Sequence, residues 1–498
     1  MKRYMYAQIF FTILFLNLAM FSASFAQQGY DINVNIVGFE NDTLLLGYQY
    51  ADKQYIKDTV LRSEDGFTFK GDEMLDCGMY ILVLPPENKY FQLLIDDTDQ
   101  EFKITTSEEK PIQDVKIEGS EENNRFYKYL QYIGEQSPKA QKLNQEIKEA
   151  KEASQKTNDL QAKLDKLNGS VDKYQLDLIE KHPTSLTARI VKASREIKLP
   201  EFDLNTDEGK RARYSYLQQH WLDNTDLSDP CLIRTSLLNN KVMTYLEKLT
   251  PQVPDSIIQS VDVVIEKASG NEETKRNWLS TLLNKYANSK VIGMDAVYVH
   301  LIFNYYAKGE TPWVDDKKLL EMIDNASKTE PLLIGKIAPE IALPTLDIET
   351  TLKVMETEES EHKKFGLGDK VSLHGLDSPF KVLFIWAPDC GHCKKSMPKM
   401  IEFYDKFEEY GVKMYAICHQ NYKKTPDCAE FITERPGMLK WINVTDPYFK
   451  SRYQSIYNVK STPQIYILDD KNEILIKRIG ADQISEVMEE LVTRSKNN

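Results

Sequence analysis

The chain has 498 residues, too many for one compact core, and this length predicts two to four domains. Hydrophobic residues make up 41% of the chain and charged residues 28%, proportions that are usual for soluble globular proteins. The formal net charge of −13 argues against nucleic acids and anionic membranes as partners, because both are themselves negatively charged.

The first 26 residues have the pattern of a secretory signal peptide. Lys2 and Arg3 supply the charged start, residues 9–21 the apolar stretch, and Ser24-Phe25-Ala26 a small-residue cleavage site. The apolar stretch is short for a membrane span, although an uncleaved anchor stays the alternative. No cysteine follows the cleavage site, which argues against a lipoprotein anchor. We therefore expect a mature chain without a membrane span, located in the periplasm or cell envelope.

Residues 27–122 are expected to form a β-sandwich-like domain. Runs typical of strands occur at Ile32–Ile36, Phe67–Phe69 and Tyr80–Leu84. Turn signals separate them, among them Glu64-Asp65-Gly66 and Pro85-Pro86. This succession of short strands and turns is typical of a small all-β sandwich or barrel.

Residues 123–334 are expected to form an all-α domain. Apolar residues recur at helical spacing from Leu143 to Leu167, in a charged helix that should end near Asn168-Gly169. Ser185 should begin another helix, after a stop at His182-Pro183. Further helices are expected around residues 214–221, 242–249, 256–268, 277–286 and 297–306. The Glu- and Lys-rich run at 145–166 is interpreted as a solvated helix face, with a coiled-coil contact as the alternative.

Residues 335–498 alternate between strand-like and helix-like patterns. A polar stretch from Glu356 to Lys364 is expected to be an exposed loop or insertion. Buried strands are expected at 382–385, 412–417, 462–468 and 473–479, and helices at 397–407, 426–433 and 484–491. Such alternation predicts an α/β layered domain.

Two cysteines lie where the first of these strands gives way to a helix. The spacing of Cys390 and Cys393 places the second thiol one helical turn from the first. The free N–H groups and partial positive charge of a helix N-terminus favour a thiolate. Cys390 is therefore the predicted nucleophile of a thiol–disulfide exchange, and Cys393 the resolving thiol. Gly391 should allow a close turn without a Cβ, and His392 should support the thiolate when protonated, unless it is only an exposed turn residue.

This part of the chain resembles the thioredoxin superfamily. The resemblance rests on Trp386-Ala387-Pro388 before the two cysteines, on Pro398 in the following helix, and on Thr462-Pro463 at the start of a later strand. It implies that Pro463 is cis and faces the cysteines, and that the backbone of Thr462 pairs with an extended substrate segment. The long span between Cys390 and Pro463 is similar to the span found in the TlpA/ResA-like subclass. The opening segment from Gly335 is similar to the entry segment of the same subclass. The β-then-helical arrangement upstream is similar to exported thioredoxin-like proteins of Bacteroidetes.

The direction of electron flow is not settled by these patterns. The Gly391-His392 pair is similar to that of disulfide isomerases and indicates an oxidising couple, whereas the TlpA/ResA-like subclass is associated with reduction. The resemblance also implies a proton carrier for Cys393, but Phe384 and Ser396 occupy the two positions where the family places a carboxylate. Asp389, next to the nucleophile, should oppose a low pKa of Cys390.

The other four cysteines are Cys77, Cys231, Cys418 and Cys428. An oxidising compartment allows any compatible pair to close, and Cys418 with Cys428 is a local candidate for a disulfide. Cys77 and Cys231 fall in different predicted domains, so each is interpreted as a small buried hydrophobic residue rather than a partner of the other.

The sequence therefore predicts an exported thiol–disulfide oxidoreductase with no cofactor and no metal. Its partners should be protein or peptide thiols and disulfides, together with an unidentified upstream redox partner. One alternative is a cell-envelope binding or sensing protein with an auxiliary redox domain. A structural zinc site at Cys390 and Cys393 would need a second ligand pair, for which only Cys418 and Cys428 are at hand. A peroxiredoxin-like peroxidase would use Cys428 as its nucleophile, but Asn421 stands where the sequence signature of peroxiredoxins has proline.

Overall fold

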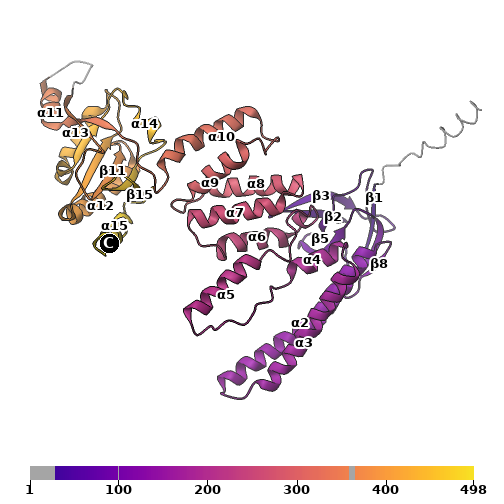
Figure 1. Cartoon of the computed structure of the whole chain (residues 1–498). Coiled ribbons are helices and arrows are strands. Elements are labelled where there is room, and N and C mark those ends of the chain that lie inside the picture. Colours follow the sequence, from indigo (N-terminus) through magenta and orange to yellow (C-terminus); the bar gives the residue numbers. More distant parts are fainter. Residues whose placement is uncertain (1–28, 99, 358–364, 498) are drawn as a thin grey trace, which may run out of the picture. The chain divides into compact units, whose positions relative to one another are not determined.

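The computed structural model describes residues 29–98, 100–357 and 365–497 (Figure 1). The expected signal peptide at 1–26 lies outside the described residues, as does most of the expected polar loop, at 358–364. The chain divides into two compact units, one of residues up to Thr250 with Asp262–Trp278, the other of Pro251–Val261 with the residues from Leu279 onward. The boundaries expected at 122/123 and 334/335 stay predictions.

The all-β region predicted at the N-terminus is confirmed. Its eight strands are β1 (Tyr30–Val37), β2 (Thr43–Tyr50), β3 (Lys53–Leu61), β4 (Phe67–Gly71), β5 (Gly78–Leu84), β6 (Lys89–Ile95), β7 (Glu101–Ser107) and β8 (Lys116–Glu118). They form two four-stranded sheets, in the orders β4-β1-β7-β8 and β3-β2-β5-β6. In β1 every second residue is buried, as the period of a half-buried strand requires. One pairing, β1 with β7, is parallel.

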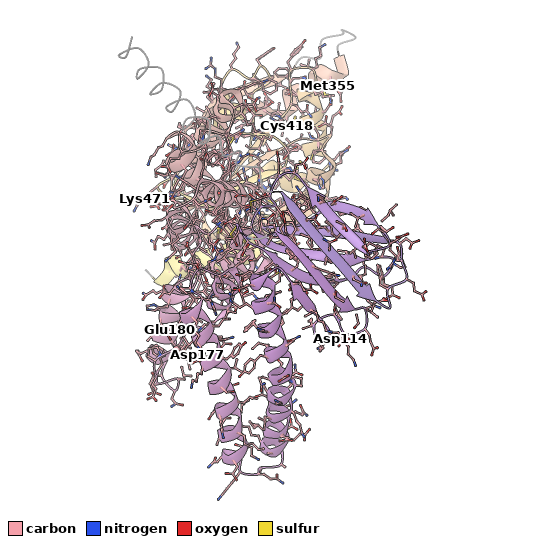
Figure 2. All side chains as sticks on the ribbon, turned by 90° about the vertical axis from the view of Figure 1, so that its right-hand side faces the viewer. Asp114, Asp177, Glu180, Met355, Cys418 and Lys471 are labelled. Carbon is pink, nitrogen blue, oxygen red and sulfur yellow. A yellow bond between two sulfur atoms is a disulfide. The ribbon has the colours of Figure 1, made fainter. Side chains whose placement is uncertain are left out.

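The first predicted helix is instead two helices. They are α2 (Glu121–Glu152) and α3 (Asn158–Lys181), which lie side by side (Figures 1 and 2). The end expected near Asn168-Gly169 was wrong, because the chain turns earlier, where Ser154 has a φ of 54°. Gly169 lies within α3, where an added Cβ would meet nothing within 4 Å. An interior glycine costs a helix only about 1 kcal/mol, and the surrounding helix formers outweigh that cost.

The remaining helices of this region confirm the prediction of an all-α segment. They are α4 (Leu186–Ser194), α5 (Asp207–His220), α6 (Ser236–Lys248), α7 (Pro254–Ala268), α8 (Glu272–Ala287), α9 (Asp295–Leu301) and α10 (Asp316–Thr329), with the short 3₁₀ helices η1 (Leu232–Arg234) and η3 (Glu330–Leu332) and the π-helix η2 (Ile302–Tyr306). Ser185 caps α4 as expected, through a bond from the N–H of Ala188. No helix among the described residues is long and apolar enough to cross a membrane.

Cys77 and Cys231 correct the sequence interpretation, because they form a disulfide with their Cα atoms 4.9 Å apart. Cys77 directly precedes β5 and Cys231 directly precedes η1, and η1 contacts β5 within the first unit. Both residues are buried, as expected, but as partners of each other. The error came from treating the β-sheets and the helices that follow as separate bodies.

The C-terminal region is the predicted α/β fold. Its strands are β9 (Ala342–Asp347), β10 (Gly366–Ser372), β11 (Phe380–Trp386), β12 (Val412–Cys418), β13 (Ile442–Thr445), β14 (Gln464–Asp469) and β15 (Ile474–Lys477). Its helices are α11 (Ile348–Thr357), α12 (Gly391–Phe407), α13 (Thr425–Thr433), α14 (Tyr453–Ile456) and α15 (Ile484–Asn497), with turns η4 (Glu408–Tyr410) and η5 (Pro436–Lys440). The sheet order is β10-β9-β13-β12-β11-β14-β15. The sequence did not predict β9, β10, β13, α11 or α14.

Strand β11 lies inside this sheet, and all seven of its residues are buried. Phe384 and Trp386 face the core that also contains residues of α12, α13 and α15, whereas Leu383 and Ile385 face the core on the other side. β11 runs parallel to β12, and β12 to β13, while β14 is antiparallel to β11. Because the carboxyl ends of parallel strands share one edge of a sheet, the segments after β11, β12 and β13 meet at that edge.

Candidate active site

The segment after β11 carries the two cysteines, and both are free thiols. Cys390 is the N-cap of α12, and its Sγ accepts a hydrogen bond from the backbone N–H of Cys393 at 3.3 Å. The same Sγ lies 3.2 Å from the carbonyl oxygen of Thr462, to which its S–H donates. Cys390 is half-buried, whereas Cys393 is fully buried. The strand-to-helix junction thus presents the first thiol and conceals the second.

The two thiols differ in acidity. Burial raises the pKa of Cys390, but hydrogen bonds from the side chains of Cys393 and Thr462, and from the backbone N–H groups of Cys393 and His392, outweigh it and lower that pKa below the usual 9.0. Burial raises the pKa of Cys393 to about 12, and the hydrogen bond to Cys390 adds to the rise. At neutral pH the half-buried Cys390 thiol is therefore the more readily ionised of the two, and the buried Cys393 thiol keeps its proton.

Thr462 lies beside Cys390, and the peptide bond between Thr462 and Pro463 is cis. They directly precede β14, whose Gln464 pairs with Ile385 of β11, so the sheet holds them beside the end of β11. Both are half-buried. The cis bond implied by the resemblance is present, while the contacts of Pro463 with the cysteines and of Thr462 with a substrate stay predictions.

The four residues expected to support the thiols have different surroundings. Trp386 is fully buried at the end of β11, with its ring 5.1 Å from that of Phe431, and Pro388 is buried in the turn that follows. His392 is exposed in the first turn of α12. The close turn expected at Gly391 was wrong, because an added Cβ there would meet nothing within 4 Å and the φ of Gly391 is not positive. A residue with a Cβ fits this position.

Asp389 does not stand beside Cys390 as an unbalanced charge. Lys424 donates to one of its carboxylate oxygens at 2.7 Å and Gln420 to the other at 2.7 Å. The hydrogen bond from Lys424 holds the pKa of Asp389 below its usual value, so the carboxylate is ionised but compensated. The sequence analysis missed Lys424 and Gln420, which lie more than thirty residues away. The sequence signal that could have pointed to Lys424 and Gln420 was the pair of cysteines that flank the loop of these two residues.

Those flanking cysteines, Cys418 and Cys428, the local candidates for a disulfide, are bonded, with their Cα atoms 6.3 Å apart. Both are buried in the core that also contains Cys393, and Cys418 pairs with Trp386 across the strands. The bridge closes the loop that supplies both partners of Asp389. With both sulfurs bonded, this pair offers neither zinc ligands nor a free nucleophile in this structure.

Phe384 and Ser396, at the two positions where the family places a carboxylate, have different surroundings. Phe384 is fully buried against Trp441, with the ring centroids 6.0 Å apart, and Ser396 is half-buried on α12. A titratable group at this edge that the sequence analysis missed is His419, whose Nδ1 lies 2.6 Å from the hydroxyl of Tyr453. Burial lowers the pKa of His419 and the charge of Asp389 partly opposes that shift.

Three protein-family models match the chain in succession. Residues 30–126 match a domain of unknown function (DUF4369), and residues 138–329 match a second (DUF5106). Residues 334–476 match the AhpC/TSA family.

Individual relatives match part of the chain. The thiol-disulfide oxidoreductase ResA of Bacillus cereus is 25% identical over 171 residues, which are 34% of this chain and 82% of ResA. A thioredoxin-like protein from Bacteroides caccae has a similar structure, with 17% identity, a TM-score of 0.43, and coverage of 59% of this chain and 98% of that one. A domain of a possible thiol-disulfide isomerase from Cytophaga hutchinsonii is 26% identical, with a TM-score of 0.26 and coverage of 34% and 99%. The C-terminal domain thus belongs to the AhpC/TSA family as a thioredoxin-like, ResA-related thiol–disulfide oxidoreductase domain, and it follows DUF4369 and DUF5106 domains.

Proposed function

We propose that this protein is an extracytoplasmic oxidoreductase that exchanges disulfides with other proteins through Cys390 and Cys393. The observation that carries the proposal is the contrast between the two thiols. One is accessible at a helix N-terminus with a lowered pKa, and the other is buried one turn away with a pKa of about 12. An exchange reaction needs such a pair, because one thiol has to attack the substrate disulfide and the other has to stay protonated until the mixed disulfide has formed.

The reaction balances as two successive displacements. The Cys390 thiolate attacks one sulfur of a substrate disulfide, that S–S bond breaks, and the other substrate sulfur leaves as a thiolate that takes up a proton. Cys393 then loses its proton and attacks the Cys390 sulfur, which releases the second substrate thiol. Two electrons pass from the protein dithiol to the substrate disulfide, and a separate redox partner has to restore the dithiol. The same steps in reverse oxidise a substrate dithiol.

Insulin reduction tests the activity. The Cys390→Ser variant should lose turnover, because the attacking thiol is gone. The Cys393→Ser variant should instead accumulate a mixed disulfide between Cys390 and the substrate, since attack occurs without resolution. An unchanged turnover in Cys390→Ser would overturn the proposal. The reduction potential of the couple then gives the direction, since a value near −270 mV, roughly that of thioredoxin, indicates a reductase and one near −180 mV, roughly that of disulfide isomerase, indicates an oxidant or isomerase.

The extracytoplasmic location rests on two supports. The sequence begins with a charged, then apolar segment and a small-residue cleavage site at Ala26. The two disulfides, Cys77–Cys231 and Cys418–Cys428, fit a protein that folds in an oxidising compartment. Cell fractionation with N-terminal sequencing tests it. We expect a mature protein that begins at Gln27 in the periplasmic or envelope fraction, and a full-length protein in the cytosol would contradict the proposal.

A further inference from the structure

Three exposed aromatic side chains gather at the sheet edge that carries Cys390. Tyr422 lies in the loop after β12, and Tyr448 and Phe449 lie in the loop after β13. Their exposed fractions are 37%, 57% and 39%. The rings of Tyr422 and Tyr448 stack at 5.9 Å with 14° between their planes, so the two loops present one surface. Scattered exposed aromatics are ordinary, but a cluster next to a reactive group marks a contact surface.

The same surface is positively charged. The Nζ of Lys423 lies 5.9 Å from the centre of the Tyr422 ring, and the Nζ of Lys450 lies 5.6 Å from that of Tyr448. Within the ranges that the structure describes, no carboxylate lies at ion-pair distance from Lys423, Lys450 or the nearby Arg452. This excess of cations contrasts with the whole chain, whose net charge is −13.

Two acidic groups at this edge of the sheet, Asp446 and Asp389, are already engaged. The carboxylate of Asp446 is buried and accepts bonds from the backbone N–H groups of Lys450 and Ser451, at 3.1 and 2.8 Å, and from the Ser451 hydroxyl at 2.6 Å. Asp389 is held by Lys424 and Gln420. The bonds to Asp446 also fix the loop in which Phe449 has a φ of 51°, a conformation that bulky residues rarely adopt. The surface is therefore held in place before any partner arrives.

Contacts through intermediate residues connect this surface to the segment that carries Cys390. Lys424 follows Tyr422 and Lys423 in the chain and binds Asp389, the neighbour of Cys390. The ring of Phe449 lies 6.0 Å from that of His419, whose backbone N–H donates to the carbonyl oxygen of Trp386 at 2.7 Å.

We propose that Tyr422, Lys423, Tyr448, Phe449 and Lys450, here called the aromatic–lysine patch, bind an acidic segment of the protein whose disulfide Cys390 attacks. This inference rests on the proposed function and names its substrate class. Carboxylates of the partner pair with the two lysines, and apolar side chains beside its cysteine cover the stacked rings. Because the chain as a whole is acidic, it repels an acidic partner elsewhere and directs it to this edge.

Three synthetic peptides of equal length test the proposal, each with the same internal disulfide flanked by acidic, neutral or basic residues. Hydroxyethyl disulfide serves as a small substrate that does not reach the patch. For the full chain we expect the highest kcat/KM on the acidic peptide, with a preference that shrinks as salt is added. The Lys423→Gln/Lys450→Gln variant should lose about fivefold on the acidic peptide and less than about twofold on hydroxyethyl disulfide.

A matched control is the Lys413→Gln/Lys471→Gln variant, which removes two exposed lysines from the opposite edge of the same sheet. It should leave the preference for the acidic peptide intact. An equal loss in both double variants, or equal rates on the three peptides, would overturn the inference while leaving the proposed function standing. Patch-dependent binding to anionic lipid vesicles without any peptide preference would overturn it as well. Failure to turn over even hydroxyethyl disulfide would count against the proposed function itself.

Discussion

Cysteines stand at the carboxyl ends of both β11 and β12, yet the two strands use them in opposite ways. After β11, Cys390 and Cys393 are free thiols with pKa values shifted in opposite directions. At the end of β12, Cys418 is buried and joined to Cys428 across a short loop. The helix N-terminus and the partial exposure of Cys390 favour its thiolate, while Cys418 and Cys428 are both buried and bonded to each other. The acidity of a thiol therefore follows its surroundings, and the bridged loop supplies the partners of Asp389 beside Cys390.

Selective alkylation gives the largest expected contrast between the two thiols after β11. At pH 7 iodoacetamide should modify Cys390 at least about a thousandfold faster than Cys393, because only thiolates react and their pKa values lie below 9 and at about 12. The rate at Cys390 should rise with pH, pass half of its maximum at a pH below 9, and level off above that point as the thiolate becomes fully formed. Mass spectrometry of the reduced protein checks this, and equal labelling of the two thiols would contradict the assignment of roles.

Removal of each disulfide should lower stability by amounts that follow loop length. The Cys418→Ser/Cys428→Ser variant opens a loop with a sequence separation of 10 and should lose about 3 kcal/mol of unfolding free energy. The Cys77→Ser/Cys231→Ser variant opens one of 154 and should lose up to about 5 kcal/mol. Urea unfolding followed by circular dichroism measures both. A Cys418→Ser/Cys428→Ser variant as stable as the parent would show that the second cysteine pair has no structural role.

A smaller effect tests the connection between the segment after β11, which contains Asp389, and the loop after β12, which contains Lys424. The Lys424→Gln variant leaves the Asp389 carboxylate uncompensated next to Cys390, so the pKa of Cys390 should rise and its alkylation rate at pH 7 should fall roughly threefold. Adding Asp389→Asn should restore the rate, because the opposing charge is then gone. Alkylation rates measured from pH 5 to 10 check both variants. A double variant as slow as Lys424→Gln alone would mean that Lys424 acts otherwise than through Asp389.

The smallest effect is expected at Gly391. Because open space surrounds its Cβ position and its φ is not positive, Gly391→Ala should change stability by less than about 1 kcal/mol and leave exchange nearly unchanged. Thermal unfolding and insulin reduction measure the two quantities. A large loss of activity would indicate that a substrate backbone passes closely over this residue, which the free protein does not show.

Local patterns predicted much of the fold and the chemical centre of the site. The apolar run at 382–385 lies in the buried strand β11, the cysteines open α12, and the candidate pair Cys418 and Cys428 is bonded, since each depends on residues close in sequence. Short elements escaped prediction. Strand β13 has only four residues and α14 another four, too few to show a hydrophobic period.

The sequence by itself determined that a strand delivers two thiols to a helix N-terminus, because strand period, helix period and N-terminal polarity are all local properties. Tertiary structure decided which charges and rings surround those thiols. Lys424 reaches Asp389, Phe449 lies beside His419, and Cys77 meets Cys231 only because sheet pairing and helix packing bring distant segments together. Such contacts depend on the three-dimensional course of the chain, and no periodicity along the sequence encodes them.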